Sequence, residues 1–265
     1  MQQLTDRDYL RTDQYADATN LNARASLHQR FSTNAHPWHR WVFDQFDLQA
    51  RCHVLDLGSG PGDLWLENRD RIPRGWAIVL ADLSPAMLHK ARPRLASRDA
   101  RFAYRVVDAQ SIPYPDGTFH QVVANHMLYH VPNRERALCE IHRVLRPGGQ
   151  LYAATNGLHH MKELRELLTS TCRDFETPQV ATQFGLENGT EQLSQCFDRV
   201  GLYRQQNELV VTEAEPLLAY ARSMLGEAVV QDDVDALSRK IRREIGTRGA
   251  IHIQKDAGLF KATKL

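Results

Sequence analysis

The feature that most constrains this chain is a glycine-rich turn directly after a short apolar run. Residues 53–57 are typical of a buried β-strand, and the turn that begins within them has the pattern Asp56-x-Gly58-x-Gly60-x-Gly62. Glycine has no Cβ, so the backbone can turn tightly and a ligand can approach the main chain closely. An amphipathic stretch follows, and the N–H groups at the start of a helix favour polar or anionic groups. The pattern therefore predicts an α/β sheet with a ligand-binding loop after its first strand.

Apolar runs and amphipathic segments alternate from residue 37 to residue 156. Strands that alternate with helices of this length pair in parallel through right-handed crossovers, so the pattern predicts a doubly wound α/β sheet. Start signals such as Ser84-Pro85 and Asn133, and the stop signal Pro147-Gly148-Gly149, delimit the helices. Further strands are predicted at 77–81, 102–107, 121–124 and 150–154, and helices at 37–46, 84–95 and 133–145.

The alternation loosens outside this region. Before it, residues 1–36 are polar, with a helical pattern around 21–31. After it, the spacing of apolar residues predicts mainly helices, followed by an extended end. The predicted segments are helices at 161–175 and 190–200, an extended run at 202–212, a mostly helical stretch at 213–246, and either a strand pair or one long strand at 251–263.

Charge and cysteine content exclude several classes of protein. The formal net charge is only +1, from 33 Lys+Arg and 32 Asp+Glu, so the chain has no broad field to attract nucleic acid or an anionic membrane. The N-terminus is charged where a signal peptide is apolar, and no apolar stretch approaches the roughly 18–20 residues that span a bilayer. We therefore expect a cytoplasmic protein. The four cysteines form no CxxC pair, which favours reduced thiols over a zinc site or disulfides.

Two more acids follow predicted strands. Asp82 comes directly after the second strand, where a carboxylate can accept hydrogen bonds from both hydroxyls of a ribose. The segment Asp82-Leu-Ser-Pro is also good turn chemistry, and both roles can hold together. Asp108 ends the third strand beside the small Ala109, where it can accept a hydrogen bond from an adenine amino group. The carboxyl ends of parallel strands share one edge, so the acids predict a site for an adenosine-bearing ligand there.

The spacing of the glycines distinguishes between such ligands. A dinucleotide loop has the pattern G-x-G-x-x-G, and its third glycine would stand where this chain has Asp63. Asp56 at the start of the turn also suits a ligand with an ammonium group better than one with a pyrophosphate. A nucleotide-dependent oxidoreductase is therefore the weaker interpretation.

Five segments together resemble the class I S-adenosylmethionine-dependent methyltransferases, in particular the branch with quinone-methylating and other small-molecule enzymes. The resemblance implies a Rossmann-like α/β fold: a doubly wound, mostly parallel seven-stranded sheet with a reversed last strand, and helical insertions in the C-terminal half. It implies S-adenosyl-L-methionine as the cofactor. The matching segments are Val54–Gly62, Ala81–Leu88, Asp108–Phe119, Asn125–Asn133 and Arg143–Gly149.

The resemblance also implies how the site is divided. The glycine loop and Asp56 would hold the methionine moiety, Asp82 the ribose, and the third strand's end the adenine. The match is weak before residue 36 and after 157, where such families select their acceptors. We therefore expect an N-terminal helical cap over 1–36 and one domain over 37–265, with a cofactor-binding half of about 37–156 and an acceptor- and lid-bearing half of about 157–265. The implied cofactor-binding residues are Asp56, Gly58, Ser59, Gly60, Gly62, Asp82, Leu83, Met87, Asp108, Ala109, Asn125 and His126.

Histidines supply the candidates for a general base. His126 and His130 are four residues apart, and an imidazole titrates in a useful range, although His130 packed as a structural histidine is an equal alternative. A zinc-binding HExxH helix needs Glu after its first His, where Met127 stands, so no metal is predicted. The pair His159-His160 could supply a base instead, although an exposed loop is the favoured interpretation.

The N-terminal segment also carries Tyr15, Arg24, His28 and Arg30, and an arginine there could pair with the cofactor's carboxylate. A solvated helix face is an equal alternative for these residues. Trp38 and Trp41 are predicted to pack their helix onto the sheet.

Methyl transfer from a sulfonium needs alignment and exclusion of water more than covalent help from the protein. Asn125-His-Met-Leu differs from the Asn/Asp-Pro-Pro-Tyr/Phe of many amino-methylating enzymes, and no Pro-Cys nucleophile stands there. A small-molecule acceptor is therefore predicted, without a membrane or nucleic-acid partner. The alternatives are an RNA or protein methyltransferase, or a cofactor-binding homologue without methyl transfer. The methylated atom and the oligomeric state are not predicted.

Overall fold

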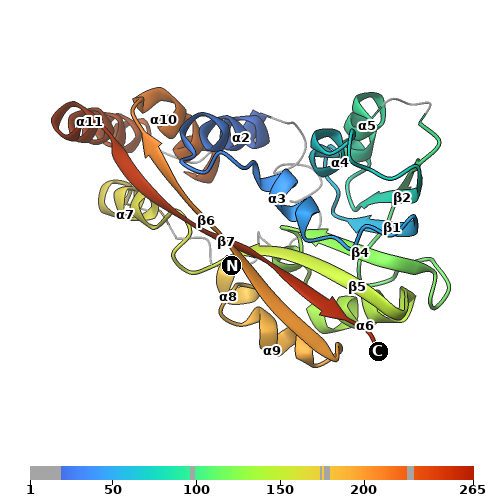
Figure 1. Cartoon of the computed structure of the whole chain (residues 1–265). Coiled ribbons are helices and arrows are strands. Elements are labelled where there is room, and N and C mark those ends of the chain that lie inside the picture. The colour runs from blue at the N-terminus through green and yellow to red at the C-terminus, as the bar shows by residue number, and fades with distance from the viewer. Residues whose placement is uncertain (1–18, 96–98, 174, 176–179, 226–229) are drawn as a thin grey trace.

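A seven-stranded sheet organises the protein, in the order β3-β2-β1-β4-β5-β7-β6. The computed structural model (Figure 1) describes residues 19–95, 99–173, 175, 180–225 and 230–265. The pairs among β1 to β5 are parallel, whereas β7 runs antiparallel to both β5 and β6. The predicted doubly wound sheet with a reversed last strand is therefore confirmed. The strands are β1 (Arg51–Leu57), β2 (Gly75–Asp82), β3 (Phe102–Val106), β4 (Phe119–Asn125), β5 (Leu145–Asn156), β6 (Arg199–Val211) and β7 (Ile251–Thr263).

Helices cover both faces of the sheet, so its central strands are apolar on both sides. On one face, Phe43, Trp65 and Leu88 pack with Val54 and Tyr152. The helices on this face are α3 (Trp38–Asp44), α4 (Asp63–Glu67) and α5 (Pro85–Arg94). The opposite face carries the helix η3 (Leu128–His130), α6 (Arg134–Val144), α8 (Val180–Gln183) and α9 (Gly189–Ser194).

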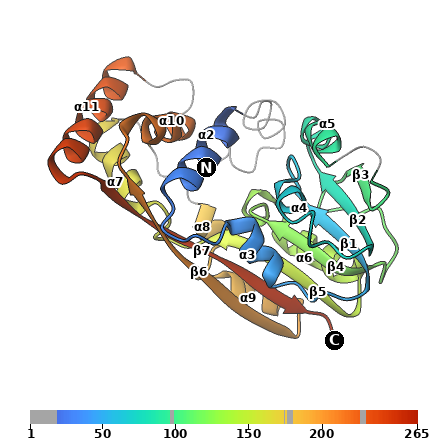
Figure 2. The same cartoon turned by 45° about the horizontal axis from the view of Figure 1, so that its top comes forward.

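A third apolar core lies beyond the sheet. β5 pairs with β7 only as far as Asn156, opposite Ala257, so residues 206–211 and 251–256 continue as a two-stranded ribbon. Leu27, Leu209 and Leu218 belong to the core that is built on this ribbon. We call the ribbon and its helices the lid subdomain, which Figure 2 shows to one side of α4 and α5. Its helices are α2 (Thr19–Phe31), α7 (Lys162–Thr171), α10 (Ala214–Leu225) and α11 (Gln231–Arg248).

Most predicted elements are confirmed, and the differences lie where long-range pairing decides the structure. The helix predicted at 190–200 is wrong at its end: α9 stops at Ser194, because Arg199–Gly201 pair with β7. The helix predicted at 133–145 ends at Val144, and the stop signal lies inside β5. The helix predicted at 161–175 is α7 and ends at Thr171. The segment 251–263 is one strand.

Of the predicted N-terminal cap, the structure describes α2 and the residues after it. Residues 1–18, including Tyr15, lie outside the described residues. Among the residues that are described, no helix is both long and apolar enough to cross a membrane. The described cysteines are all free thiols.

Candidate functional site

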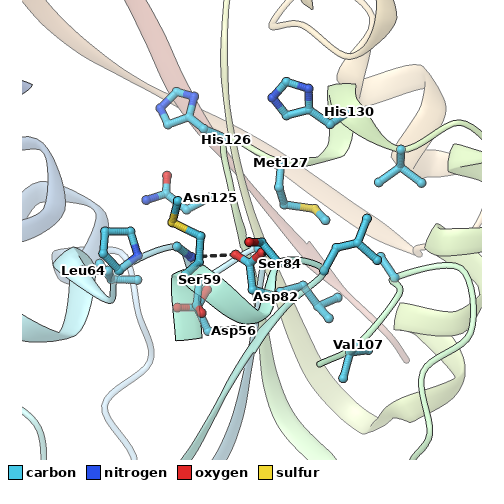
Figure 3. A pocket seen from close by; sticks show the side chains of 18 of the residues that line it. Asp56, Ser59, Leu64, Asp82, Ser84, Val107, Asn125, His126, Met127 and His130 are labelled. Carbon is cyan, nitrogen blue, oxygen red and sulfur yellow. Dashed lines mark hydrogen bonds between the residues drawn. The ribbon is translucent and has the colours of Figure 1, made fainter. Parts of the chain in front are cut away.

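A pocket of about 330 Å³ opens at the carboxyl edge of the sheet. It lies where β1, β2 and β4 end, so the sheet itself brings together residues that are far apart in the sequence. Figure 3 shows Asp56 and Asp82 on one side of the pocket and Asn125, His126 and His130 on another. The predicted residues that line it are Asp56, Gly58, Ser59, Gly60, Asp82, Leu83, Met87, Asp108, Ala109, Asn125, His126 and His130.

The glycine loop is shaped for close approach. Gly58, Gly60 and Gly62 have φ angles of +65°, +55° and +79°, a left-handed backbone that other residues adopt at a cost. A Cβ on Gly58 would lie 2.7 Å from the Cβ of Met127, whereas one on Gly60 would meet nothing within 4 Å. Gly60 therefore presents bare backbone to open space.

Gly62 differs from its neighbours, because it is not among the residues that line the pocket. A Cβ there would lie 2.9 Å from Leu95 Cδ1 and 3.2 Å from Leu80 Cδ2. Gly62 also precedes α4, whose first residue is Asp63. Its place in the structure fits close packing of the loop against α5 and β2 better than direct contact with a ligand.

Asp82 fixes the glycine loop to the end of β2. Its Oδ2 accepts a hydrogen bond from the Gly60 N–H at 2.9 Å, and its Oδ1 accepts one from the Ser84 N–H at 2.8 Å. Burial raises the pKa of Asp82, while the backbone N–H groups around it oppose that rise. A carboxylate has about four acceptor positions, so Asp82 keeps capacity for further donors such as hydroxyls.

Asp56 has an unmet hydrogen-bonding capacity. The Trp65 indole N–H donates to its Oδ2 at 2.7 Å, but its buried Oδ1 has no partner. Burial, with a smaller contribution from the charge of Asp82, raises the pKa of Asp56 to about 7. A buried, unpartnered carboxylate oxygen is costly unless a donor or a cation meets it. The atom therefore fits a ligand that brings an ammonium group.

Part of the pocket lining is apolar. Met87, Val107 and Ala109 are buried there. Asp108 accepts a hydrogen bond from the Gln110 N–H at 3.0 Å, which holds its carboxylate beside this lining. Apolar walls with one acceptor at the rim suit a planar heterocycle that carries an amino group.

His126 stands at the end of β4 in an unusual conformation. It has a φ of +56°, which is strained for a residue with a side chain, and its N–H donates to the Ala154 carbonyl at 3.0 Å. Its ring lies 5.2 Å from Trp38, and its buried Nδ1 has no partner. Burial lowers the pKa of His126 to about 3. His130 follows in the short turn η3, so the two rings do not share a helical face.

Several lining residues come from elements whose place the sequence does not reveal. Arg24 of α2 reaches the pocket, and its guanidinium is held by Ser223 of α10 through bonds of 3.0 and 2.8 Å. His39 of α3 also lines the pocket. Trp38 packs on Trp41 and on His126, so it contacts the site as well as the core. The exposed loop predicted for His159-His160 is wrong in part, because the His160 ring packs near His28.

The groups that line the pocket favour an organic ligand. In the part of the chain that the structure describes, no group of three or more His, Cys, Asp and Glu side chains is arranged to hold a metal ion. The pocket instead combines a bare glycine backbone, an unpartnered carboxylate oxygen and an apolar slot. These features fit an organic ligand that carries an ammonium group, hydroxyl groups and a heterocycle.

Comparison with known proteins agrees with this geometry. Residues 55–153 match a family described as a methyltransferase domain. The chain is 36% identical over 116 residues to the ubiquinone/menaquinone biosynthesis C-methyltransferase UbiE of Hydrogenovibrio crunogenus, a match that covers 43% of this chain and 46% of that protein. It is 38% identical over 114 residues to the demethylmenaquinone methyltransferase of Thermus thermophilus, covering 43% and 51%. The matches thus span about half the length of these curated relatives.

The fold extends the likeness beyond the matched segment. A solved structure of phosphoethanolamine N-methyltransferase 2 from Haemonchus contortus, in complex with phosphomonomethylethanolamine and S-adenosylhomocysteine, aligns with a TM-score of 0.60. The identity is 20%, and the alignment covers 97% of this chain and 59% of that one. The fold is Rossmann-like, and the pocket lies at the carboxyl edge of its sheet. In sequence, the core at residues 55–153 is similar to S-adenosylmethionine-dependent methyltransferases.

Proposed function

We propose that this protein transfers a methyl group from S-adenosyl-L-methionine to a small-molecule acceptor. The observation that carries the proposal is the unpartnered Oδ1 of Asp56, in the same pocket as an Asp82 that already holds the glycine loop. The formal net charge of only +1 and the small-molecule activities named for the similar proteins support a small acceptor. They favour it over an RNA or protein acceptor.

The residues of this chain would hold the cofactor in three parts. Asp56 would pair with the ammonium, and Asp82 would accept hydrogen bonds from the ribose while keeping Gly60 in place. Asp108 and Ala109 would bound the adenine, with Leu83 and Met87 on the adenosine. Asn125 and His126, at the end of β4, would face the reactive end. When bound, the cofactor supplies an electrophilic methyl group on a sulfonium, and in-line displacement transfers it.

The chain's part in catalysis is then alignment and exclusion of water. Trp38 and the strained backbone of His126 fix the wall beside the reactive end. His126 and His130 stay candidates for a general base. Because its pKa is low, His126 would be a weak general base. The low pKa favours a role as a neutral hydrogen-bonding partner.

Isothermal calorimetry with S-adenosylhomocysteine and with NAD tests the proposal. We expect the wild type to bind S-adenosylhomocysteine and not to bind NAD. Asp82→Ala should weaken binding by roughly 1–3 kcal/mol, the scale of a lost hydrogen-bond partner. Asp70→Ala is the matched control, because Asp70 is exposed and pairs with Arg40 on the surface.

Two results would contradict the proposed cofactor or its contact with Asp82. Unchanged affinity in a folded Asp82→Ala variant would refute the role of Asp82, and tighter binding of NAD would refute the cofactor. Tight S-adenosylhomocysteine binding without any methylated product across a broad acceptor panel would favour a homologue that binds the cofactor without methyl transfer.

A further inference from the structure

A second group of titratable side chains lies beyond the reactive end of the pocket. Its histidines come from different elements: His28 from α2, His126 from the end of β4, and His160 from the turn after β5. The rings of His28 and His160 lie 6.2 Å apart, and His28 meets Tyr220 of α10 edge-on at 5.6 Å. The Nδ1 atoms of all three histidines are buried and have no hydrogen-bond partner. A structural histidine normally has such a partner, so these rings are polar groups that the fold leaves unsatisfied.

Lys255 is on the part of β7 that runs beside the turn of His160. It follows Ile251 and Ile253 on the same face of β7, a face that those two residues pack into the core of the lid subdomain. The backbone N–H of Met161 donates to the Gln254 carbonyl at 2.9 Å, which brings the turn of His160 against this part of β7. The charge of Lys255 lowers the pKa of His28, His126 and His160 alike.

Among the described residues, the charges that act on this group are positive. Burial and neighbouring cations, Arg24 and Arg165 included, lower the pKa values of the three rings, and no carboxylate contributes. Burial alone lowers the pKa of Lys255, to about 8.

The described acids nearby are engaged elsewhere. Asp256 pairs with Arg204 at 2.7 Å. Glu163 accepts a hydrogen bond from the Gln254 N–H at 2.9 Å, and Glu187 accepts one from the Leu158 N–H at 3.1 Å. We call the group formed by His28, His126, His160 and Lys255 the basic chamber. It combines buried ring nitrogens with a cation, and among the described residues it has no counter-ion.

The two ends of the site thus have opposite character. Asp56, Asp82 and Asp108 surround the place of a cationic cofactor, and His126 belongs both to that pocket and to the basic chamber. We propose that the basic chamber binds the methyl acceptor and selects a small acidic molecule, such as a phenol, an enol or a carboxylic acid, whose oxyanion pairs with Lys255. This inference rests on the proposed function and names the substrate class of that site.

The proton and the electron pairs of the methyl transfer can be followed through the groups that are present. The neutral amine of Lys255 takes the proton of the acceptor, which leaves an ammonium beside an oxyanion. An electron pair of the acceptor then forms the bond to the methyl carbon, while the carbon–sulfur bond breaks and its pair stays on sulfur. The products are the methylated acceptor and S-adenosylhomocysteine, and Lys255 releases the proton to solvent. A cationic amine acceptor would instead meet Lys255 and Arg24 without a compensating carboxylate.

Binding of 4-nitrophenol tests this inference, because its phenolate is coloured and its phenol is not. The titration is followed by absorbance, with and without saturating S-adenosylhomocysteine. Neutral 4-nitroanisole and the cation benzylammonium are compared by calorimetry. We expect the wild type to bind 4-nitrophenol as the phenolate and more tightly than either comparison ligand. Lys255→Met should weaken phenolate binding by about tenfold to a hundredfold.

Control variants show whether a loss of phenolate binding comes from the lost charge of Lys255. They distinguish this cause from misfolding and from a failure of cofactor binding. Lys255→Arg keeps the cation and should retain affinity within a few-fold. Lys162→Met removes an exposed lysine of α7 and should change nothing. All variants should bind S-adenosylhomocysteine like the wild type.

Three results would count against the acceptor class. Equal binding of 4-nitroanisole, tighter binding of benzylammonium, or unchanged phenolate binding in a folded Lys255→Met variant would each overturn it. Failure of the wild type to bind S-adenosylhomocysteine would instead refute the proposed function, while the titration without that ligand still tests the basic chamber.

Discussion

The two halves of this molecule are built by different means. In the half that holds the candidate cofactor pocket, the acids Asp56 and Asp82 lie at the carboxyl ends of neighbouring strands. In the lid subdomain, the positions of the candidate side chains depend on how a long ribbon and separate helices pack together. Short-range geometry therefore positions the acids, and long-range packing positions His28 and Lys255. This difference predicts that the two halves respond differently to substitution.

The largest expected effect tests whether the lid subdomain opens on its own. Leu218 of α10 is buried in its core, so Leu218→Ala should cost about 2–5 kcal/mol of local stability. We expect faster amide hydrogen exchange in α2, α10 and α11, with unchanged protection in β1, β2 and β4. Leu151→Ala, in the central sheet, is the matched substitution and should loosen the whole protein. Equal loosening by both variants would show that the halves unfold as one unit.

Gly62 distinguishes a packing role from a binding role. Gly62→Ala should destabilise the protein by about 1–2 kcal/mol through its left-handed backbone. Contact with Leu95 at 2.9 Å should add to this cost. Gly246→Ala, in an open part of α11, should instead stabilise by about 0.5–1 kcal/mol. Thermal unfolding checks both variants, and an undiminished midpoint for Gly62→Ala would contradict the packing role.

The pKa of Asp56 predicts how ligand binding depends on pH. Its folded-state pKa, about 7, lies above the usual value of 3.8, so the fold favours the protonated carboxyl. Stability without ligand should therefore fall as pH rises from about 4 through 7. Binding of an ammonium ligand needs the ionised form, so affinity for S-adenosylhomocysteine should rise with pH up to about 7, at most tenfold per pH unit. Calorimetry on Asp56→Asn should show a flatter profile, and an identical slope would remove Asp56 from the site.

Substitution of Arg24 should have the smallest effect. It tests whether the lid subdomain contributes to the cofactor pocket. Arg24→Met should weaken S-adenosylhomocysteine binding by about 1 kcal/mol if its guanidinium meets the ligand's carboxylate. Arg30→Met is the control from the same helix, since Arg30 pairs with Glu213 on the surface. Surface plasmon resonance resolves this difference, and equal affinities of the two variants would place Arg24 outside the binding contacts.

Most of the sheet and the acids of the pocket could be predicted because their signals are local. An apolar run, a glycine turn and an acid at a strand end need no knowledge of the rest of the chain. Gly62 shows the limit of this reasoning: its spacing suggests ligand contact, whereas its surroundings are Leu95 and Leu80. A glycine pattern alone does not tell close packing against protein from close approach of a ligand.

The basic chamber could not be predicted, because its members share no local pattern. Lys255 continues an alternation that begins with Ile251 and Ile253, which hints that its face is buried. Nothing in that alternation indicates that α2 would bring His28 to the same place. From the sequence, Arg24 and His28 fit a solvated helix face as well as they fit the site. Their actual position depends on the packing of α2 against α10.

The position of β7 has a consequence for how the chain folds. β7 is the last strand in chain order, yet it lies between β5 and β6 and gives β6 its pairing partner. During synthesis, β6 and the ribbon part of the lid subdomain must therefore wait, with exposed edges, until about 40 further residues have been made. Such non-local pairing is slow, and unpaired edges invite aggregation. β7 thus completes the pairing of both the central sheet and the ribbon.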